Sequence, residues 1–196
     1  TFLRAESDHV CELLDAQLDN LEDDEIIRQV KAFKPDVVGI TCFTVQLVDV
    51  HNTIALCKQA GVPRIVLGGP HINDFPRESV GLPHVDAVVK GEGQQPLLTL
   101  LDVWERGEEA KGIPGVIAHK DDPIPDEDVY FSNDLDVYPI TDLTLVDYQR
   151  YYDVMGNGGV FTTMVTSRGC PYRCTFCNTP RHRYRVMSPE RVCDEL

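Results

Sequence analysis

Short apolar runs alternate with helical patterns between residues 10 and 106, and no other feature of the sequence restricts the fold as strongly. Three of these runs are rich in β-branched residues, namely DVVGIT (36–41), RIVLGG (64–69) and DAVVKG (86–91). Runs of this kind are typical of parallel strands that are buried on both faces. Strands that alternate with helices predict an α/β fold with a doubly wound parallel sheet of the flavodoxin-like type.

Three helices and one further strand are predicted around these runs. In residues 23–33, apolar side chains recur every three or four positions until Pro35 ends the pattern. Residues 46–60 show the same spacing, and so does a further helix, in which Pro96 is expected at the first helical position. VCELLDA (10–16) is predicted as another strand.

The alternation of apolar runs and helical patterns ends after about residue 118. HKDDPIPDEDVYFSNDLDVYP is acidic and rich in proline, which predicts a connecting segment over the surface. VFTTMVTSRGC (160–170) predicts a strand, and MSPERVCDEL (187–196) predicts a helix capped by Ser188. We therefore expect a first domain at 1–118, a linker at 119–158 and the start of a second domain at 159–196.

Charge and hydropathy exclude several classes of function. The formal net charge of −14 argues against a general nucleic-acid-binding surface. Residues 160–196 nevertheless carry six arginines and three acids, so the basic end of the chain is the cysteine-rich end. No apolar run is long enough to span a membrane, and the first twenty residues lack the pattern of a signal peptide.

Seven cysteines lie unevenly along the chain, at positions 11, 42, 57, 170, 174, 177 and 193. An odd number without a secretory signal does not indicate a disulfide framework. We expect a cytoplasmic protein, because in a reducing compartment clustered cysteines usually serve metal or redox chemistry.

Three of these cysteines fall within eight positions in TSRGCPYRCTFCNTP (166–180), with the spacing C-x3-C-x2-C. Thiolates at Cys170, Cys174 and Cys177 can hold three irons of a [4Fe–4S] cluster and leave the fourth iron open. A zinc site that recruits Cys193 or His182 as its fourth ligand is an alternative. A thioredoxin-like pair is another, but it leaves Cys170 unexplained.

The residues around the cysteines resemble the signature of radical S-adenosylmethionine (SAM) enzymes. SRGCPYRCTFC is similar to the form found in their cobalamin-associated branch, and RYRVMSPERVCDEL resembles the segment that follows the cluster loop there. The resemblance implies that Cys170, Cys174 and Cys177 bind a [4Fe–4S] cluster whose open iron chelates SAM. It also implies reductive cleavage of SAM to a 5′-deoxyadenosyl radical, Phe176 beside the adenine, and a (β/α) barrel that begins near residue 159.

The first half resembles the cobalamin-binding domain that precedes the barrel in that branch. The resemblance rests on KPDVVGIT, RIVLGGPH and DAVVKGEGQ and covers about residues 10–106. Ligands of a doubly wound sheet bind beyond the carboxyl ends of its strands. The candidate cobalamin contacts are therefore Thr41, Cys42, Phe43, Thr44, Gly68, Gly69, His71, Gly91, Glu92 and Gly93. The alternative is that these glycines only close turns between helices and strands.

The histidines do not match a cobalt ligand. Asp49-Val50-His51 imitates the D-x-H-x-x-G motif of mutase-type cobalamin domains, but Ile54 stands where that motif has glycine. We expect His51 to be a solvated helix residue. His71 is expected to contact the nucleotide tail or the corrin edge and to leave the cobalt without a protein histidine.

A second cluster of the methylthiotransferase type is not expected in the first half. Cys42 matches one position of that cluster roughly, but Gly69 stands where the next cysteine would be. Cys11, Cys42 and Cys57 are therefore predicted to be small core residues.

The sequence thus predicts a cobalamin-dependent radical SAM enzyme that performs radical methyl transfer or rearrangement on an unactivated carbon. The resemblance implies a small-molecule substrate and a reductant protein such as a flavodoxin or ferredoxin. It also implies a first strand before Thr1 and the rest of the barrel after Leu196, so we expect the fragment alone to be inactive. A radical SAM enzyme without bound cobalamin and a zinc-stabilised, non-catalytic binding module remain alternatives.

Overall fold

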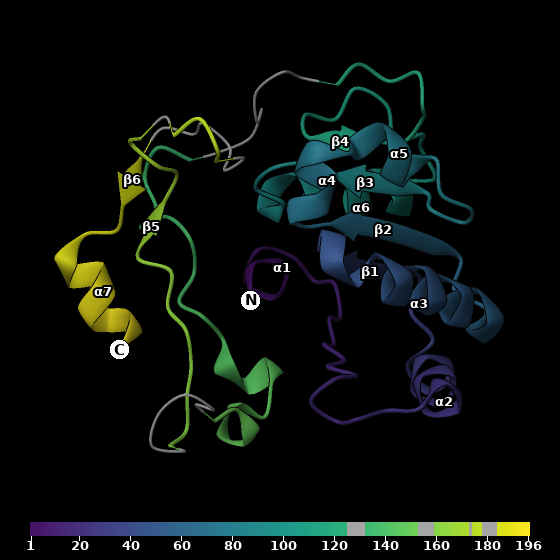
Figure 1. Cartoon of the computed structure of the whole chain (residues 1–196), viewed down its shortest axis with the longest axis horizontal. Helices are drawn as coiled ribbons and strands as arrows, with labels where there is room; N and C mark the ends of the chain where they lie inside the picture. The colour runs from purple at the N-terminus through teal and green to yellow at the C-terminus, as the bar shows by residue number, and fades with distance from the viewer. Residues whose placement is uncertain (125–131, 153–158, 173, 178–183) are drawn as a thin grey trace. The chain divides into compact units, whose positions relative to one another are not determined.

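The structure is a computed structural model that describes residues 1–124, 132–152, 159–172, 174–177 and 184–196. The chain divides into two compact units (Figure 1). One unit is Leu21–Phe131, and the other combines Thr1–Asn20 with Ser132–Leu196. The domain boundaries expected from the sequence remain a prediction, and each unit is described by itself.

The first unit, Leu21–Phe131, contains a four-stranded sheet in the order β1-β2-β3-β4. Its strands are β1 (Val37–Thr41), β2 (Arg64–Gly68), β3 (Ala87–Val89) and β4 (Val116–Ile117). The first three strands are parallel, with Val37 opposite Arg64 and Val66 opposite Ala87. β4 pairs with β3 in the antiparallel direction, so the sheet is mixed. The predicted α/β class and the three parallel strands are confirmed.

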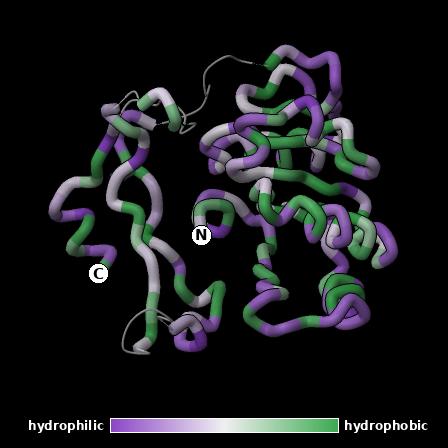
Figure 2. Tube along the Cα trace, in the orientation of Figure 1, coloured by the Kyte–Doolittle hydropathy of each residue, from purple (hydrophilic) through white to green (hydrophobic). Residues whose placement is uncertain are grey.

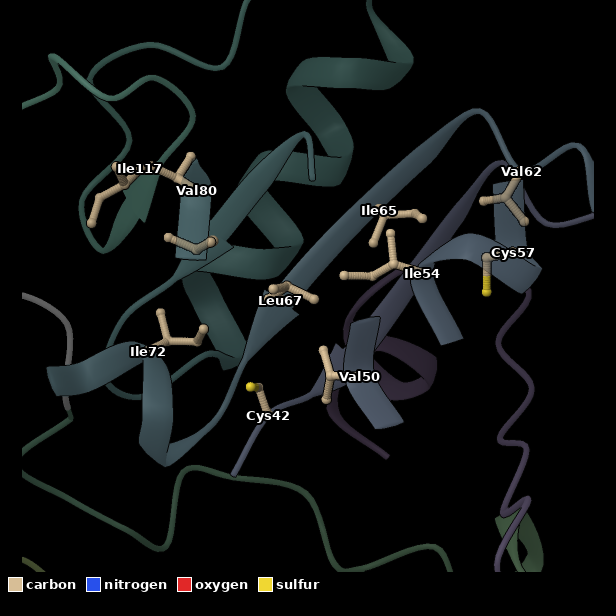
Figure 3. Close-up of a cluster of buried hydrophobic side chains, with 11 residues drawn as sticks. Cys42, Val50, Ile54, Cys57, Val62, Ile65, Leu67, Ile72, Val80 and Ile117 are labelled. Carbon is tan, nitrogen blue, oxygen red and sulfur yellow. The ribbon is translucent and has the colours of Figure 1, made fainter. Parts of the chain in front are cut away.

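Helices cover both faces of this sheet. α3 (Leu47–Ala60), α4 (Pro70–Asp74) and α5 (Pro76–Val80) pack on one face, where Ile65 and Leu67 of β2 point into a buried apolar cluster (Figure 3). α6 (Gln94–Glu105) packs on the opposite face, against Val66 and other strand residues. Alternate residues of β2 thus face opposite layers, as expected for a strand buried on both sides.

Two further helical elements belong to the same unit. α2 (Asp23–Phe33) confirms the predicted helix, with three acidic residues in its first turn, where they stabilise the positive end of the helix dipole. A 3₁₀ turn, η1 (Thr44–Gln46), leads from β1 into α3. Figure 2 shows hydrophobic stretches along the buried elements and hydrophilic residues over many outer turns.

The second unit contains α1 (Phe2–Glu6), the 3₁₀ turns η2 (Leu143–Leu145) and η3 (Tyr148–Arg150), and a short antiparallel pair of strands. The pair consists of β5 (Ser167–Arg168) and β6 (Arg185–Val186). α7 (Pro189–Glu195) follows β6 and begins as predicted, because the Ser188 hydroxyl accepts a hydrogen bond from the Arg191 N–H at 3.0 Å.

Three details differ from the sequence-based expectations. Residues 10–16, all of which are described, form no strand, and Val10 is 84% exposed. Of residues 160–170, only Ser167 and Arg168 form a strand, since only these two have a ladder partner in β6. Pro96 is the third residue of α6, because the helix begins at Gln94. None of the described helices has the length and apolar character that crossing a membrane requires.

Candidate functional site

The loops that follow β1, β2 and β3 meet at one edge of the sheet. They do so because the three strands are parallel and in register, so their carboxyl ends lie on the same side. Beyond the strands, the Cys42 N–H donates to the Gly68 carbonyl at 2.7 Å, and the His71 N–H donates to the Cys42 carbonyl at 3.0 Å. Two of the three predicted loops are therefore joined by backbone hydrogen bonds.

Gly69 makes the close approach of these two loops possible. Its φ angle is +103°, and a Cβ atom there would lie 2.9 Å from the Cys42 carbonyl oxygen and 3.0 Å from the Cys42 nitrogen. Both neighbours are backbone atoms, which cannot rotate away as a side chain could. Only glycine fits this position without strain.

We expect Gly69→Ala to lower the free energy of unfolding of the sheet unit by about 1–3 kcal/mol, because the variant combines an unfavourable φ with a backbone clash. Urea unfolding followed by the fluorescence of Trp104, the chain's one tryptophan, would measure the loss. Gly107→Ala is the matched control, since Gly107 also has a positive φ but no atom within 4 Å of the added Cβ. Equal losses in both variants would contradict the role given to the close approach.

His71 is almost completely buried, with 4% of its surface exposed. Its Nδ1 lies 3.1 Å from the Thr44 hydroxyl, and its ring lies 5.0 Å from the ring of Phe75. The contact with Thr44 ties the loop after β1 to α4. His51 is exposed on α3, as predicted for a solvated helix residue.

The third loop is held by a residue that the sequence analysis did not select. The Gly91 N–H donates to the Asn73 Oδ1 of α4 at 2.8 Å, and the preceding Lys90 N–H donates to the Gly115 carbonyl at 2.8 Å. Gly91 has a φ of +82°, and Gly93 precedes the first turn of α6. Asn73 therefore connects the loop after β3 to the helix that follows β2. Nothing in the local pattern of the sequence marked it.

Exposed apolar side chains lie next to these loops. Phe43 is half-exposed, Val45 is 94% exposed and Val48 is 82% exposed, and the three lie between the end of β1 and the first turn of α3. An apolar surface beside glycine-containing loops fits a large, flat, partly apolar ligand such as a corrin ring.

A cavity of about 430 Å³ opens beside the loop after β3. It lies between Lys90 and the segment that forms the end of α4 and the start of α5, and its lining includes Asp74, Arg77 and Glu78. The lining is mixed, because charged side chains of both signs alternate with the apolar side chains of Phe75, Pro76 and Ile124.

The buried cysteines of the sheet unit are core residues, as predicted. Cys42 is fully buried and Cys57 is 2% exposed, and burial raises the pKa of both thiols. A raised pKa leaves less thiolate, which is the form that binds metal. Cys11 differs, because it is half-buried in the other unit, where its Sγ lies 3.6 Å from the His9 carbonyl oxygen.

The cysteine loop connects β5 to β6. Cys170 is half-buried, and Cys174 and Cys177 are exposed. The Cys177 N–H donates to the Cys174 carbonyl at 3.2 Å, which closes a turn between these two residues. The donor set fits an iron–sulfur cluster held by thiolates, and it also fits zinc.

Phe176 lies within this turn and is 90% exposed, so it is available to a ligand and does not fill a core. Cys193, a candidate fourth zinc ligand, is an exposed residue of α7. His182, the other candidate, lies outside the described residues.

Residues 1–101 match the family model described as "B12 binding domain". An uncharacterized methyltransferase of Pyrococcus horikoshii is 32% identical over 195 residues, which cover 96% of this chain and 42% of that protein. The hopanoid C-3 methylase of Methylococcus capsulatus is 31% identical, over 96% of this chain and 36% of its own length. The chain thus spans less than half the length of these curated relatives.

Two solved structures share the fold across 99% of this chain, each at 20% identity. The cobalamin-dependent SAM radical enzyme OxsB, with aqua-cobalamin and SAM bound, has a TM-score of 0.76, and the match covers 27% of its chain. The radical SAM methyltransferase TsrM from Kitasatospora setae, with cobalamin and a [4Fe–4S] cluster bound, has a TM-score of 0.69, and the match covers 40% of its chain.

Proposed function

This chain belongs to the B12 binding domain family, and from that membership we propose that it forms the cofactor-binding part of a cobalamin-dependent radical SAM enzyme. The reaction would be a radical methyl transfer or rearrangement on an unactivated carbon of a small molecule. A reductant protein such as a flavodoxin or ferredoxin would supply the electron, and residues from about 159 onward would begin the (β/α) barrel.

One observation carries this proposal. A B12 binding domain and a C-x3-C-x2-C loop with exposed or half-buried cysteines occur in one chain. Neither feature alone specifies the reaction, because B12 binding domains and three-cysteine loops each serve several chemistries. Their combination supports a cobalamin site and a [4Fe–4S] site in the same enzyme.

At the cysteine loop, Cys170, Cys174 and Cys177 would each hold one iron and leave the fourth for SAM. When bound, the cluster supplies one electron that cleaves SAM and provides a radical able to abstract hydrogen from the substrate. Phe176, which is exposed beside the ligands, would stack on the adenine of SAM.

At the sheet edge, we propose that the loops at Thr41–Thr44, Gly68–His71 and Gly91–Gly93 form the cobalamin site. The backbone of Gly68 and Gly91 allows close approach, and the apolar surface of Val45 would cover part of the ring. His71 would hold the loops in place, because its ring Nδ1 lies within hydrogen-bond distance of the Thr44 hydroxyl.

The cob(II)alamin form of the full-length protein is expected to show no nitrogen superhyperfine splitting from a protein histidine. The reason is that His71 is buried against Thr44 and Phe75, while His51 is exposed on α3. Electron paramagnetic resonance of the wild type, His71→Ala and His51→Ala would test this. A splitting that disappears in either variant would show that this histidine is a cobalt ligand.

Cofactor analysis of the full-length protein after anaerobic purification tests the proposed function directly. Iron, acid-labile sulfide and a corrinoid in one preparation would support it. Iron and sulfide without a corrinoid would favour a radical SAM enzyme that does not bind cobalamin. Zinc without sulfide would favour a non-catalytic binding module and reject the proposal.

A further inference from the structure

The cysteine loop is closed by a very short pair of strands. Ser167 pairs with Val186 and Arg168 pairs with Arg185, and the Met187 N–H extends the ladder to the Thr166 carbonyl at 2.9 Å. The residues between the strands, 169–184, include all three cysteines of the loop. Because a two-stranded ribbon this short is marginally stable by itself, other contacts must hold the two ends of the loop together.

A segment that precedes the loop by about thirty residues supplies such contacts. We call Ser132–Asp142 the strap. It lies along β6 and α7, and four hydrogen bonds join the two segments in chain order. Arg185 Nη1 donates to the Ser132 carbonyl, and the Ser188 N–H donates to Asp136 Oδ1 at 3.0 Å. Arg191 Nη2 donates to the Tyr138 carbonyl at 3.0 Å, and the Thr141 N–H of the strap donates to Glu195 Oε1 at 2.8 Å. The strap and the segment that leaves the cysteine loop thus run side by side in the same direction.

The strap also has local order of its own. The Ser132 hydroxyl accepts from the Asp134 N–H at 3.2 Å, and Asp134 Oδ1 accepts from the Asp136 N–H at 2.9 Å. Leu135, between these turns, is fully buried. Hydrogen bonds from Ser188, through its side chain and its backbone N–H, hold the pKa of Asp136 below its usual value, so this carboxylate is charged at neutral pH.

The strap reaches the entrance of the cysteine loop as well as its exit. The Arg168 guanidinium lies 4.8 Å from the centre of the Tyr138 ring, which is a cation–π distance. Arg168 belongs to β5, two residues before Cys170, and Tyr138 belongs to the strap. One segment therefore contacts both ends of the loop that carries the three thiols.

We propose that the strap is a positioning element for the cysteine loop: it holds β5 and β6 together before any metal binds and so keeps Cys170, Cys174 and Cys177 within reach of one cluster. The physical reason is entropic. A loop whose ends are already fixed loses less conformational freedom when its ligands converge on a metal. The part of this inference that concerns iron rests on the metal site proposed above.

Hydrogen–deuterium exchange of the metal-free full-length protein tests the strap without any cofactor. In Asp136→Ala, the amides of residues 185–188 should exchange about three- to tenfold faster, because one hydrogen bond that holds them is lost. Asp136→Asn keeps an acceptor oxygen and should restore slow exchange. Asp19→Ala is the matched control, since Asp19 is a partly exposed residue of the same unit that pairs with Arg150 away from the strap. Unchanged exchange in Asp136→Ala would overturn the proposal.

Iron release from the anaerobically reconstituted protein tests the positioning role. Loss of iron to a chelator should be faster in Asp136→Ala than in the wild type, Asp136→Asn and Asp19→Ala. Faster exchange with unchanged iron release would show that the strap holds the strands but does not position the metal site, and it would overturn the proposal. If the wild type takes up no iron, the proposed function fails, and the exchange experiment alone decides whether the strap holds the loop ends.

Discussion

Replacing Cys170, Cys174 and Cys177 together by alanine should abolish iron binding by the anaerobically reconstituted protein, from about four irons per chain to none. The three thiols belong to one loop, and Cys174 and Cys177 are exposed to solvent. Without them, no thiolate remains in the loop to hold an iron. Iron and sulfide analysis, together with the visible absorption of the cluster, would measure the loss.

Cys193→Ala provides the matched control for this experiment. Cys193 is also an exposed cysteine close to the loop in sequence, but it belongs to α7. A [4Fe–4S] cluster with three protein ligands predicts full iron content in this variant. If the triple variant kept its iron, the assignment of the loop would be wrong. If the wild type bound zinc that was lost on the Cys193 substitution, the site would be a four-ligand zinc site.

The parallel part of the sheet could be predicted from sequence because each strand lies in a short, mostly apolar run that is rich in β-branched residues and is bounded by turn signals. The runs at 36–41 and 64–69 contain β1 and β2 within one or two residues, and α3 follows β1 after one 3₁₀ turn. Burial on both faces requires apolar residues at consecutive positions, and that requirement leaves a clear pattern.

Other parts of the fold could not be predicted because they depend on partners distant in sequence. β4 has only two residues, Val116 and Ile117, and becomes a strand by pairing with β3. Residues 10–16 have the composition of a strand but do not pair with another strand, and composition alone does not provide a pairing partner. The strap bonds to residues about fifty positions away, and hydrophobic periodicity carries no information about contacts of that range.

At the candidate site, the sequence indicated the loops but not how they are joined. Strand ends followed by Gly68, Gly69 and Gly91 were sufficient to predict one shared edge. The hydrogen bond between Thr44 and His71 and the one from Gly91 to Asn73 depend on side chains of different loops that meet only in the folded sheet. His71 is buried and lies within hydrogen-bond distance of Thr44, and its predicted contact with the nucleotide tail or the corrin edge stays a prediction.

Leu67→Ala is expected to destabilise the sheet unit strongly, by about 3 kcal/mol, because it removes a side chain that is fully buried between the sheet and its helices. Leu67 lies in the cluster that also contains Cys42, Ile54 and Ile72 (Figure 3), and it directly precedes the loop at Gly68. Urea unfolding followed by Trp104 fluorescence would measure the change. Trp104 is suitable because it lies in α6, on the opposite face of the same sheet.

Val48→Ala complements Leu67→Ala, because it tests the proposed cobalamin site without disturbing the core. Val48 is 82% exposed, so its truncation should change the free energy of unfolding by less than about 0.5 kcal/mol. If the apolar surface after β1 covers the corrin ring, the same change should weaken corrinoid binding about fivefold through lost apolar contact. A variant that is fully stable and binds the corrinoid as tightly as the wild type would remove this surface from the site. Reduced stability of Val48→Ala would instead assign the residue to the core, where the structure does not place it.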